Sequence, residues 1–213
     1  MNRISLLLLG ILLCMPLCAQ RDQQAKELLD KASATFRSAG GIQVKFDLTG
    51  YSKNGTRKGS EQGEIKLKGN KFVLDTNNAT SWFDGQTQWS YLKASDEVNI
   101  SNPTPEELEN INPYSLISQY RQGYNYKYNG SKSINGRQGD ELILTPTGKN
   151  KDISRITLFI SKNGQPIHLK IEQKDQTWNE ITITSYKTGE KYPDSLFKFN
   201  KRNYPDAETV DLR

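Results

Sequence analysis

The sequence predicts an α+β fold that is mainly antiparallel β-sheet, with about eleven strands and about three helices. Short runs in which apolar and polar residues alternate recur along most of the chain, and turn residues such as Asn, Asp and Gly separate them. Helical spacing of apolar residues occurs only near the N-terminus and in a proline-containing stretch near the middle. Hydrophobic residues make up only 34% of the chain, so we expect a thin core and a single curved layer of sheet.

Residues 1–20 have the pattern of a cleaved secretory signal peptide. Arg3 provides a basic start, an apolar run follows, and small residues lead up to Ala19 and Gln20. The apolar run is too short to cross a bilayer. We expect cleavage after Ala19 or Gln20, which leaves residues 21–213 as one exported domain.

Both cysteines of the chain, Cys14 and Cys18, lie in this leader. The mature domain therefore has no disulfide and depends on its core for stability. The alternative interpretation of the leader is a lipoprotein signal acylated at Cys18, which the bulky Leu17 before that cysteine disfavours.

The first helix is expected over residues 22–36, because apolar residues recur there at helical spacing with charged residues between them. Gly40 and Gly41 end it. The first strand is expected over residues 42–48. Its alternation places four apolar residues on one side: Ile42, Val44, Phe46 and Leu48.

A meander of about five short strands is expected over residues 63–100. Apolar residues alternate along its first strands: Ile65, Leu67, Phe72 and Leu74. Aromatic residues flank the predicted turn at Asp84 and Gly85: Trp82, Trp89 and Tyr91. An apolar, aromatic face of this size has to be shielded from water. The pattern leaves open whether other parts of the protein core or a ligand shield it.

Two short helices are expected after this meander. Pro105 begins the first, with Thr104 as its N-cap and acidic residues in its first turn. The second is expected over residues 114–122, after Pro113 and before Gly123. An apolar stripe lies along it: Leu116, Ile117 and Tyr120. A helix inserted into a meander has to lie on a sheet face or inside its curve.

Strands are expected again from residue 124 to residue 186. Their alternation is clearest in residues 124–128, 141–145, 154–161, 167–171 and 178–186. After Phe197 and Phe199, residues 203–213 are expected to form an extended strap.

The mature chain lacks the residues that most catalytic or metal sites require. Its one histidine, His168, lies between two apolar residues of a strand, so its side chain is expected to point away from theirs. Without cysteine and with one histidine, thiolate and multi-histidine metal sites are excluded. No nucleophile elbow or phosphate-binding loop occurs. We expect no enzyme, although two carboxylates that meet in a cleft would leave no mark in the sequence.

The net charge of the chain is +5. Its lysines are scattered over strand faces rather than clustered, which is typical of a solvated outer face. Because the chain is exported, we expect no nucleic-acid partner.

The order of these parts resembles the LolA-like periplasmic carriers, which move lipoproteins to the outer membrane of Gram-negative bacteria. Three motifs carry the resemblance: GEIKLKGNKF at residues 63–72, DGQTQWSY at residues 84–91 and LILTP at residues 142–146. The ending, with Tyr204, Pro205 and residues 210–213, resembles the Bacteroidetes branch in particular. Each motif is weak alone, but their order and spacing over the whole mature chain are fairly specific.

The resemblance implies an incomplete, unclosed β-barrel whose apolar concave face holds the acyl chains of a lipoprotein. Residues of the first strands would line that cavity: Val44, Phe46, Leu48, Ile65, Leu67, Phe72, Leu74, Trp82, Trp89 and Tyr91. The helix over residues 114–122 would act as a lid in the mouth of the barrel, through three apolar side chains: Leu116, Ile117 and Tyr120.

The resemblance also implies partners and a location. An inner-membrane ATP-driven release complex would load the carrier with acylated lipoproteins, and an outer-membrane acceptor of unknown identity would receive them. Such a carrier works in the periplasm, uses no cofactor and is expected to be a monomer. The alternatives are an envelope lipid sensor or regulator on the same fold, a carrier of another lipid, and a sheet whose aromatic face is only core.

One departure from the family pattern concerns the lid. Proteobacterial carriers have an Arg-Pro pair where this chain has Gly69 and Asn70. That arginine is regarded as helping to hold the lid and tune release. The latch of the predicted lid is therefore unassigned in this chain.

Overall fold

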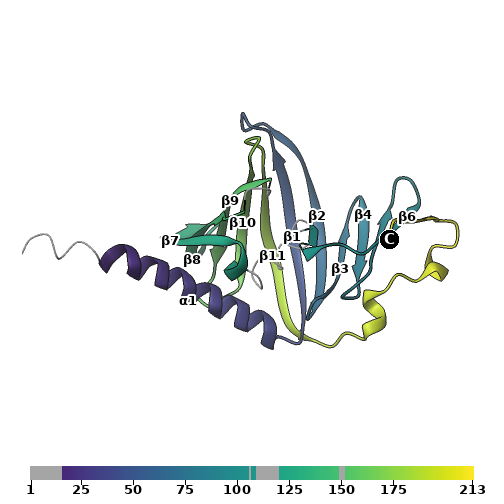
Figure 1. Ribbon diagram of the computed structural model, residues 1–213, viewed down its shortest axis with the longest axis horizontal. Helices are drawn as coiled ribbons and strands as arrows, with labels where there is room; N and C mark the ends of the chain where they lie inside the picture. Colours follow the sequence, from purple (N-terminus) through teal and green to yellow (C-terminus); the bar gives the residue numbers. More distant parts are fainter. Residues whose placement is uncertain (1–15, 106, 109–119, 149–151) are drawn as a thin grey trace, which may run out of the picture.

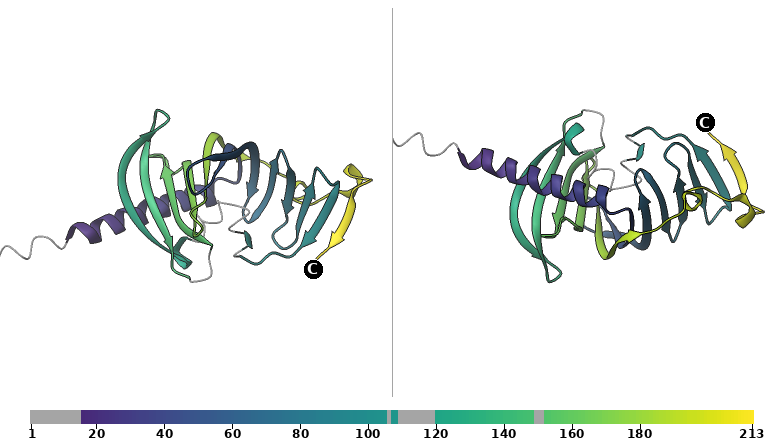
Figure 2. Two further views of the ribbon diagram at one scale, coloured as in Figure 1. Left: turned by 90° about the horizontal axis from the view of Figure 1, so that it is seen from above. Right: turned by 90° about the horizontal axis from the view of Figure 1, so that it is seen from below.

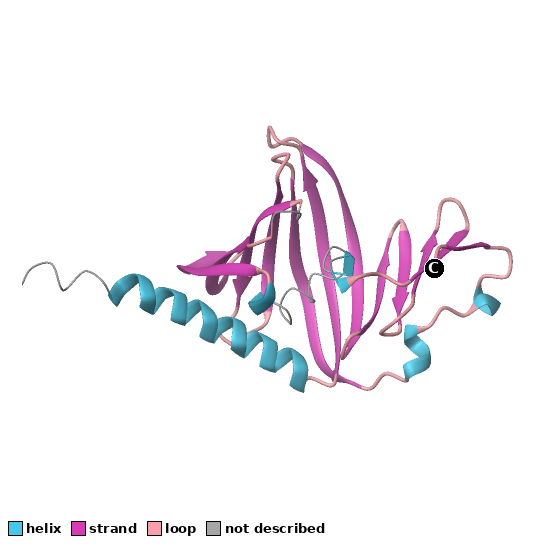
Figure 3. Cartoon of the chain, in the orientation of Figure 1, coloured by secondary structure: helices cyan, strands magenta, loops and turns pink. Residues whose placement is uncertain are grey.

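A computed structural model describes residues 16–105, 107–108, 120–148 and 152–213 of the chain (Figure 1). Within these residues the chain forms one long helix, three short 3-10 helices and a sheet of 12 strands. Figure 3 shows that the long helix lies along one side of the sheet, while the short helical turns lie in the connections.

The helix α1 (Pro16–Ser38) begins earlier than the predicted residues 22–36. It ends just before Gly40, whose φ of +70° is a backbone conformation that favours glycine. Ala25, Leu29 and Ala32 form its buried face and belong to the hydrophobic core. Among the residues that the structure describes, no helix is both long and apolar enough to cross a membrane.

The strands follow one another through short turns. The first half of the sheet contains β1 (Gly41–Tyr51), β2 (Arg57–Lys68), β3 (Lys71–Thr76), β4 (Ala79–Phe83), β5 (Gln88–Leu92) and β6 (Glu97–Ser101). The second half contains β7 (Tyr124–Ile134), β8 (Arg137–Pro146), β9 (Ile153–Ile160), β10 (Pro166–Gln173) and β11 (Trp178–Glu190). A last strand, β12 (Glu208–Asp211), lies near the C-terminus.

Strand β1 lies in the middle of the sheet and pairs antiparallel with β2 on one side and β11 on the other. The order across the sheet is β12-β6-β5-β4-β3-β2-β1-β11-β10-β9-β8-β7. Strands β12 and β7 are its two edges, so the curved sheet stays open (Figure 2). The predicted mainly antiparallel, unclosed sheet is confirmed. It has one strand more than expected, because part of the predicted strap pairs in parallel with β6.

The core lies on one face of the sheet, which we call the inner face. Ile42 and Val44 of β1 stand on it, and their partners across the β1–β2 pair are Leu67 and Ile65. The β8–β11 half contributes further buried aliphatic residues: Leu142, Leu144, Ile156, Leu158, Ile160, Leu169, Ile181 and Ile183. Since Leu29 of α1 belongs to the same cluster, the helix covers this face.

The segment between β6 and β7 is described only at its two ends. Thr104 is the predicted N-cap: its Oγ1 accepts from the Glu107 main-chain N at 3.3 Å, and Glu107 Oε2 accepts from the Thr104 main-chain N at 2.7 Å. Of the predicted helix over residues 114–122, the described part is a 3-10 turn, Tyr120–Gln122. Leu116 and Ile117 lie outside the described residues.

Tyr120 and Arg121 tie the end of that segment to α1. Lys26 Nζ donates to the Asp30 carboxylate at 2.8 Å, the Tyr120 hydroxyl donates to it at 2.5 Å, and the Arg121 guanidinium donates to it as well. These donors hold the pKa of Asp30 well below its usual range. The phenol of Tyr120 is thus buried with a charged partner.

The C-terminal segment crosses the opposite face, which we call the outer face. The 3-10 turn Asp194–Phe197 packs on β3, and Phe197 is fully buried. Lys68 and Lys71 each donate to the Asp194 carboxylate at 2.9 Å and lower its pKa to about 2. A second turn, Lys201–Asn203, leads to β12.

We predict that His168 makes the stability of this fold depend on pH. The ring points to the outer face, where Nδ1 lies 3.1 Å from the Thr182 hydroxyl, and burial lowers the histidine pKa below its ordinary value of 6.5. Below pH 6.5 the unfolded chain therefore binds a proton at His168 that the folded chain does not bind. The free energy of unfolding keeps its full value above pH 6.5 and decreases as the pH falls below it. One such proton changes the free energy of unfolding by at most about 1.4 kcal/mol per pH unit.

Urea unfolding of the wild type and His168→Gln between pH 7.5 and pH 5 tests this prediction. The variant should lose less stability on acidification than the wild type. Equal slopes in the two proteins would contradict it.

Candidate functional site

Seven of the predicted cavity residues share the inner face. Phe46 and Leu48 follow Val44 on β1 at alternate positions, and cross-strand pairing carries the same face into β2 and β3. The residues that it brings together are Val44, Phe46, Leu48, Ile65, Leu67, Phe72 and Leu74. Tyr120 of the predicted lid belongs to the same cluster.

Burial on the inner face declines along β1. Val44 is 0% exposed, whereas Phe46 and Leu48 are only partly buried. On β3 the same change separates Phe72, which is 1% exposed, from the partly buried Leu74. One end of the face is therefore closed core, and the other end presents apolar surface that an apolar ligand can contact.

Gly63 makes room for the Phe46 ring on this face. The two residues are partners in the β1–β2 pair, and a Cβ at position 63 would lie 2.3 Å from a carbon of the Phe46 ring. Any larger residue at this position would force the ring away. The glycine therefore keeps the ring of Phe46 flat against the sheet, beside the partly buried end of the face.

A pocket of about 350 Å³ lies at the open end of the apolar face. Its lining residues are Leu48, Gly50, Lys58, Gly59, Ser60, Glu61, Asn78 and Asn179. Leu48 connects it to the apolar surface, and polar groups surround the rest. Asn78 Nδ2 donates to Glu61 Oε2 at 3.2 Å within this rim. An apolar surface with a polar rim suits a ligand with an apolar body and a polar end.

The three remaining cavity residues, Trp82, Trp89 and Tyr91, lie on the outer face. Trp82 and Trp89 are partners across the β4–β5 pair, and the C-terminal segment packs on Trp82 and Tyr91. The ring centroid of Trp82 is 5.5 Å from that of Phe199, and Tyr91 is 4.5 Å from Tyr204. The structure therefore does not bring these three side chains together with the other seven. On the outer face Trp82 is buried, and Trp89 and Tyr91 are partly exposed.

The inner face of β4–β6 carries polar residues where the predicted aromatic wall was expected. Beside the apolar Phe83 and Leu92, the inward positions there include Ser81, Gln88, Ser90, Asn99 and Ser101. We did not predict a site at these polar residues. Because Gln88 and Ser90 alternate with Trp89 and Tyr91, the sequence places these two polar residues on one face of the strand. It does not indicate that this is the same face of the sheet as Phe72.

The described residues offer little for catalysis. No three His, Cys, Asp or Glu side chains among them gather in a way that could hold a metal ion. The lysines and acids of the β2 surface pair with one another, as Lys66 does with Glu64 at 3.1 Å. The partly exposed apolar surface at Phe46, Leu48 and Leu74 is suited to contact with an apolar ligand.

Comparison with known proteins gives a family match and several similar structures. Residues 15–173 match the family model described as outer membrane lipoprotein carrier protein LolA. An uncharacterized conserved protein from Thermus thermophilus is similar, with a TM-score of 0.59 and 13% identity over 88% of this chain and 99% of that one. At this identity the similarity shows a shared fold.

Two further structures are similar at lower scores. A LolA superfamily protein from Nitrosomonas europaea has a TM-score of 0.43 and 12% identity, over 82% of this chain and 97% of that one. LprF from Mycobacterium bovis has a TM-score of 0.44 and 15% identity, over 80% of this chain and 96% of that one.

We predict that Trp82 holds the C-terminal segment on the sheet. Trp82→Ala should lower the free energy of unfolding by about 3–5 kcal/mol, because it leaves a cavity beneath Phe199 and Tyr204. Trypsin should also cut faster at the lysines and arginines of residues 191–202. Urea unfolding and timed proteolysis measure these two effects.

Trp178→Ala is the matched control, because Trp178 is only partly buried and stacks on Tyr51 at 5.1 Å, away from that segment. It should leave the rate of cleavage at residues 191–202 unchanged. If both variants accelerate this cleavage equally, Trp82 does not hold the segment.

Proposed function

Because this chain belongs to the LolA family of outer membrane lipoprotein carrier proteins, we propose that it is an exported carrier that binds the acyl chains of lipoproteins. It shuttles them from the inner to the outer membrane. The observation that supports this most directly is the inner face, which is closed core at Val44 and partly exposed, apolar surface at Phe46, Leu48 and Leu74.

The apolar inner face suits acyl chains energetically. Burial of a methylene contributes about 0.8 kcal/mol, so an acyl chain of about 15 methylenes would gain about 12 kcal/mol on leaving water. A fully enclosed pocket of that strength would release its cargo too slowly for a carrier. A face that is only partly covered by the protein limits the gain and keeps release fast.

Export follows from the predicted leader. Cleavage after Ala19 or Gln20 would shorten α1 but would leave the helical residues that face the core, Ala25, Leu29 and Ala32. The periplasmic domain would therefore keep its cover on the inner face. The family's location in the bacterial envelope agrees with this assignment.

The partners of such a carrier are acylated lipoproteins, an ATP-driven release complex in the inner membrane and an acceptor in the outer membrane. The reaction is a transfer between binding sites, so it requires neither a cofactor nor a catalytic group. We propose a monomer, because the large hydrophobic residues exposed in the described part of the chain are Leu92 and Leu212, which form no broad patch.

We predict that Leu48→Asn weakens binding of an acyl fluorophore about tenfold or more. The asparagine has nearly the shape of leucine but places an amide that must lose its water against the acyl chain. Thr49→Asn is the matched control, because its side chain lies on the outer face of the same strand. Fluorescence titration, with a diacylated peptide as competitor, measures both affinities.

Equal affinities of the two variants for the acyl fluorophore would show that Leu48 does not contact the acyl chain. A wild-type protein that binds no acylated ligand would contradict the carrier function itself. Mass spectrometry of material that co-purifies from the periplasm separates the alternatives, because an acylated protein supports the carrier and a free lipid supports a sensor.

A further inference from the structure

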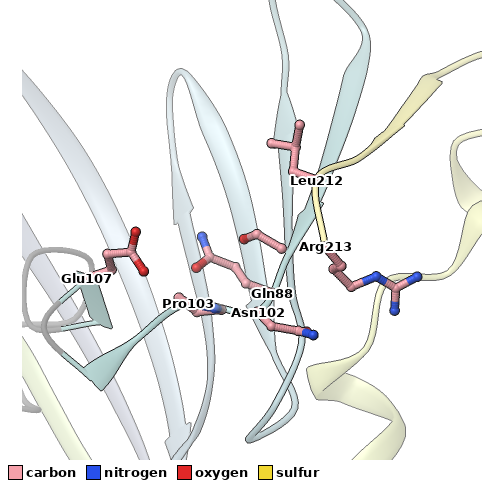
Figure 4. A pocket seen from close by; sticks show the side chains of 7 residues that line it. Gln88, Asn102, Pro103, Glu107, Leu212 and Arg213 are labelled. Atoms are coloured by element: carbon pink, nitrogen blue, oxygen red, sulfur yellow. The ribbon is translucent and has the colours of Figure 1, made fainter.

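A second pocket, lined by polar, charged and apolar side chains, lies on the inner face near the buried Phe83 (Figure 4). Its volume is about 700 Å³, and its lining residues are Gln88, Ser101, Asn102, Pro103, Glu107, Leu212 and Arg213. They come from β5, from the end of β6 and the residues after it, and from the residues after β12. The pocket is thus built by three segments that are distant in the sequence.

The pocket begins where the apolar face ends. Phe83 belongs to the hydrophobic core and packs on Phe72 with ring centroids 5.5 Å apart. Its partner across the β4–β5 pair is Gln88, which lines the pocket. The partly buried Leu74 lies opposite Ser81 across the β3–β4 pair, and Ser81 lies opposite Ser90 across the β4–β5 pair. Because Gln88 Nε2 donates to Ser90 Oγ, a ligand whose apolar part contacts Leu74 would bring an attached polar part past these two serines to Gln88.

Gln88 presents a hydrogen-bond acceptor that the described residues do not satisfy. The side chain is 7% exposed, and its Nε2 donates to Ser90 Oγ at 2.8 Å. That bond orients the amide, and the buried Oε1 has no hydrogen-bond partner among the described residues. A buried acceptor without a partner is costly, and a ligand that donates a hydrogen bond would relieve this cost.

The charges around the pocket favour a donor over an anion. The Glu107 carboxylate accepts from the Thr104 main-chain N and hydroxyl, and these bonds keep its pKa low and its charge negative. The Arg213 guanidinium is bound to Asp211, with Nε 2.9 Å and Nη2 2.6 Å from its carboxylate oxygens. In Figure 4 it points away from Gln88. A phosphate in this pocket would therefore be repelled by the Glu107 carboxylate, and the Arg213 guanidinium is already paired with Asp211.

We propose that this pocket binds the peptide that follows the acylated N-terminus of a client lipoprotein, with Gln88 Oε1 accepting from a main-chain N–H. The proposal rests on the carrier function proposed above. A peptide offers N–H donors to Gln88 and carbonyl acceptors to the Ser101 hydroxyl. It carries no fixed negative charge toward Glu107. The pocket would thus distinguish a lipoprotein from a free lipid.

Four ligands test the proposal on the full mature protein: palmitate, phosphatidylethanolamine, a diacylated peptide, and the same peptide with its main-chain amides N-methylated. N-methylation removes the donors and should weaken binding to the wild type about tenfold, the usual effect of one buried hydrogen bond. Gln88→Met, of similar length but without an acceptor, should bind both peptides with the same, weaker affinity. Its affinity for palmitate should stay unchanged.

Gln62→Met is the matched control, because Gln62 is an exposed residue of β2 whose Nε2 donates to Asp47. It should bind all four ligands like the wild type. If Gln88→Met does not fold, the affinities of the wild type for the two peptides still show whether the pocket accepts a main-chain N–H.

The outcomes separate the two proposals. Failure of the wild type to bind palmitate or any acylated ligand overturns the carrier function. Binding of palmitate together with equal affinities for the two peptides overturns the peptide pocket alone. Phosphatidylethanolamine that binds like the diacylated peptide, and loses affinity in Gln88→Met, would assign the pocket to a lipid head group and overturn the peptide assignment.

Discussion

An open, single-layered sheet has an apolar face that no second sheet covers, and the rest of this structure depends on how that face is covered. The helix α1 contacts β7, and its Leu29 belongs to the same buried cluster as Val44 and Ile65. Burial then declines toward Leu48, because the cover is partial. Apolar surface that the chain itself leaves partly open is where an apolar ligand gains most free energy by binding. The proposed carrier function rests on this incomplete cover.

The outer face is covered by a different part of the same chain. The C-terminal segment is attached by the ion pairs of Asp194 with Lys68 and Lys71, and its aromatic rings pack on Trp82. Those ion pairs are exposed and contribute little each, so burial of the rings supplies most of the attachment. Trp82 and Trp89 lie on this outer face, and on the inner face of β4–β6 most positions other than Phe83 and Leu92 carry small or polar side chains.

The inner face therefore has an apolar half and a polar half, which meet at two residue pairs. The partly buried Leu74 lies opposite Ser81, and Phe83 lies opposite Gln88. A turn in which Asp84 Oδ1 accepts from the main-chain N of Thr87 at 3.0 Å holds this pair in place. A ligand with an apolar body and a hydrogen-bonding continuation matches this division, which is the chemistry of an acylated peptide.

The sequence by itself determined the strands, the N-terminal helix and the Thr104 cap, because these depend on local periodicity and on short-range hydrogen bonds. It also placed Val44 and Phe46 together, because they alternate within one strand. It could not decide whether Trp82 shares a face with Phe72. That depends on pairing between strands, and in the structure Phe72 lies opposite Phe83 while Trp82 lies opposite Val73. A shift of one residue in register moves every side chain of a strand to the other face, so only the tertiary structure could assign the indoles to the outer core and Gln88 to the inner pocket.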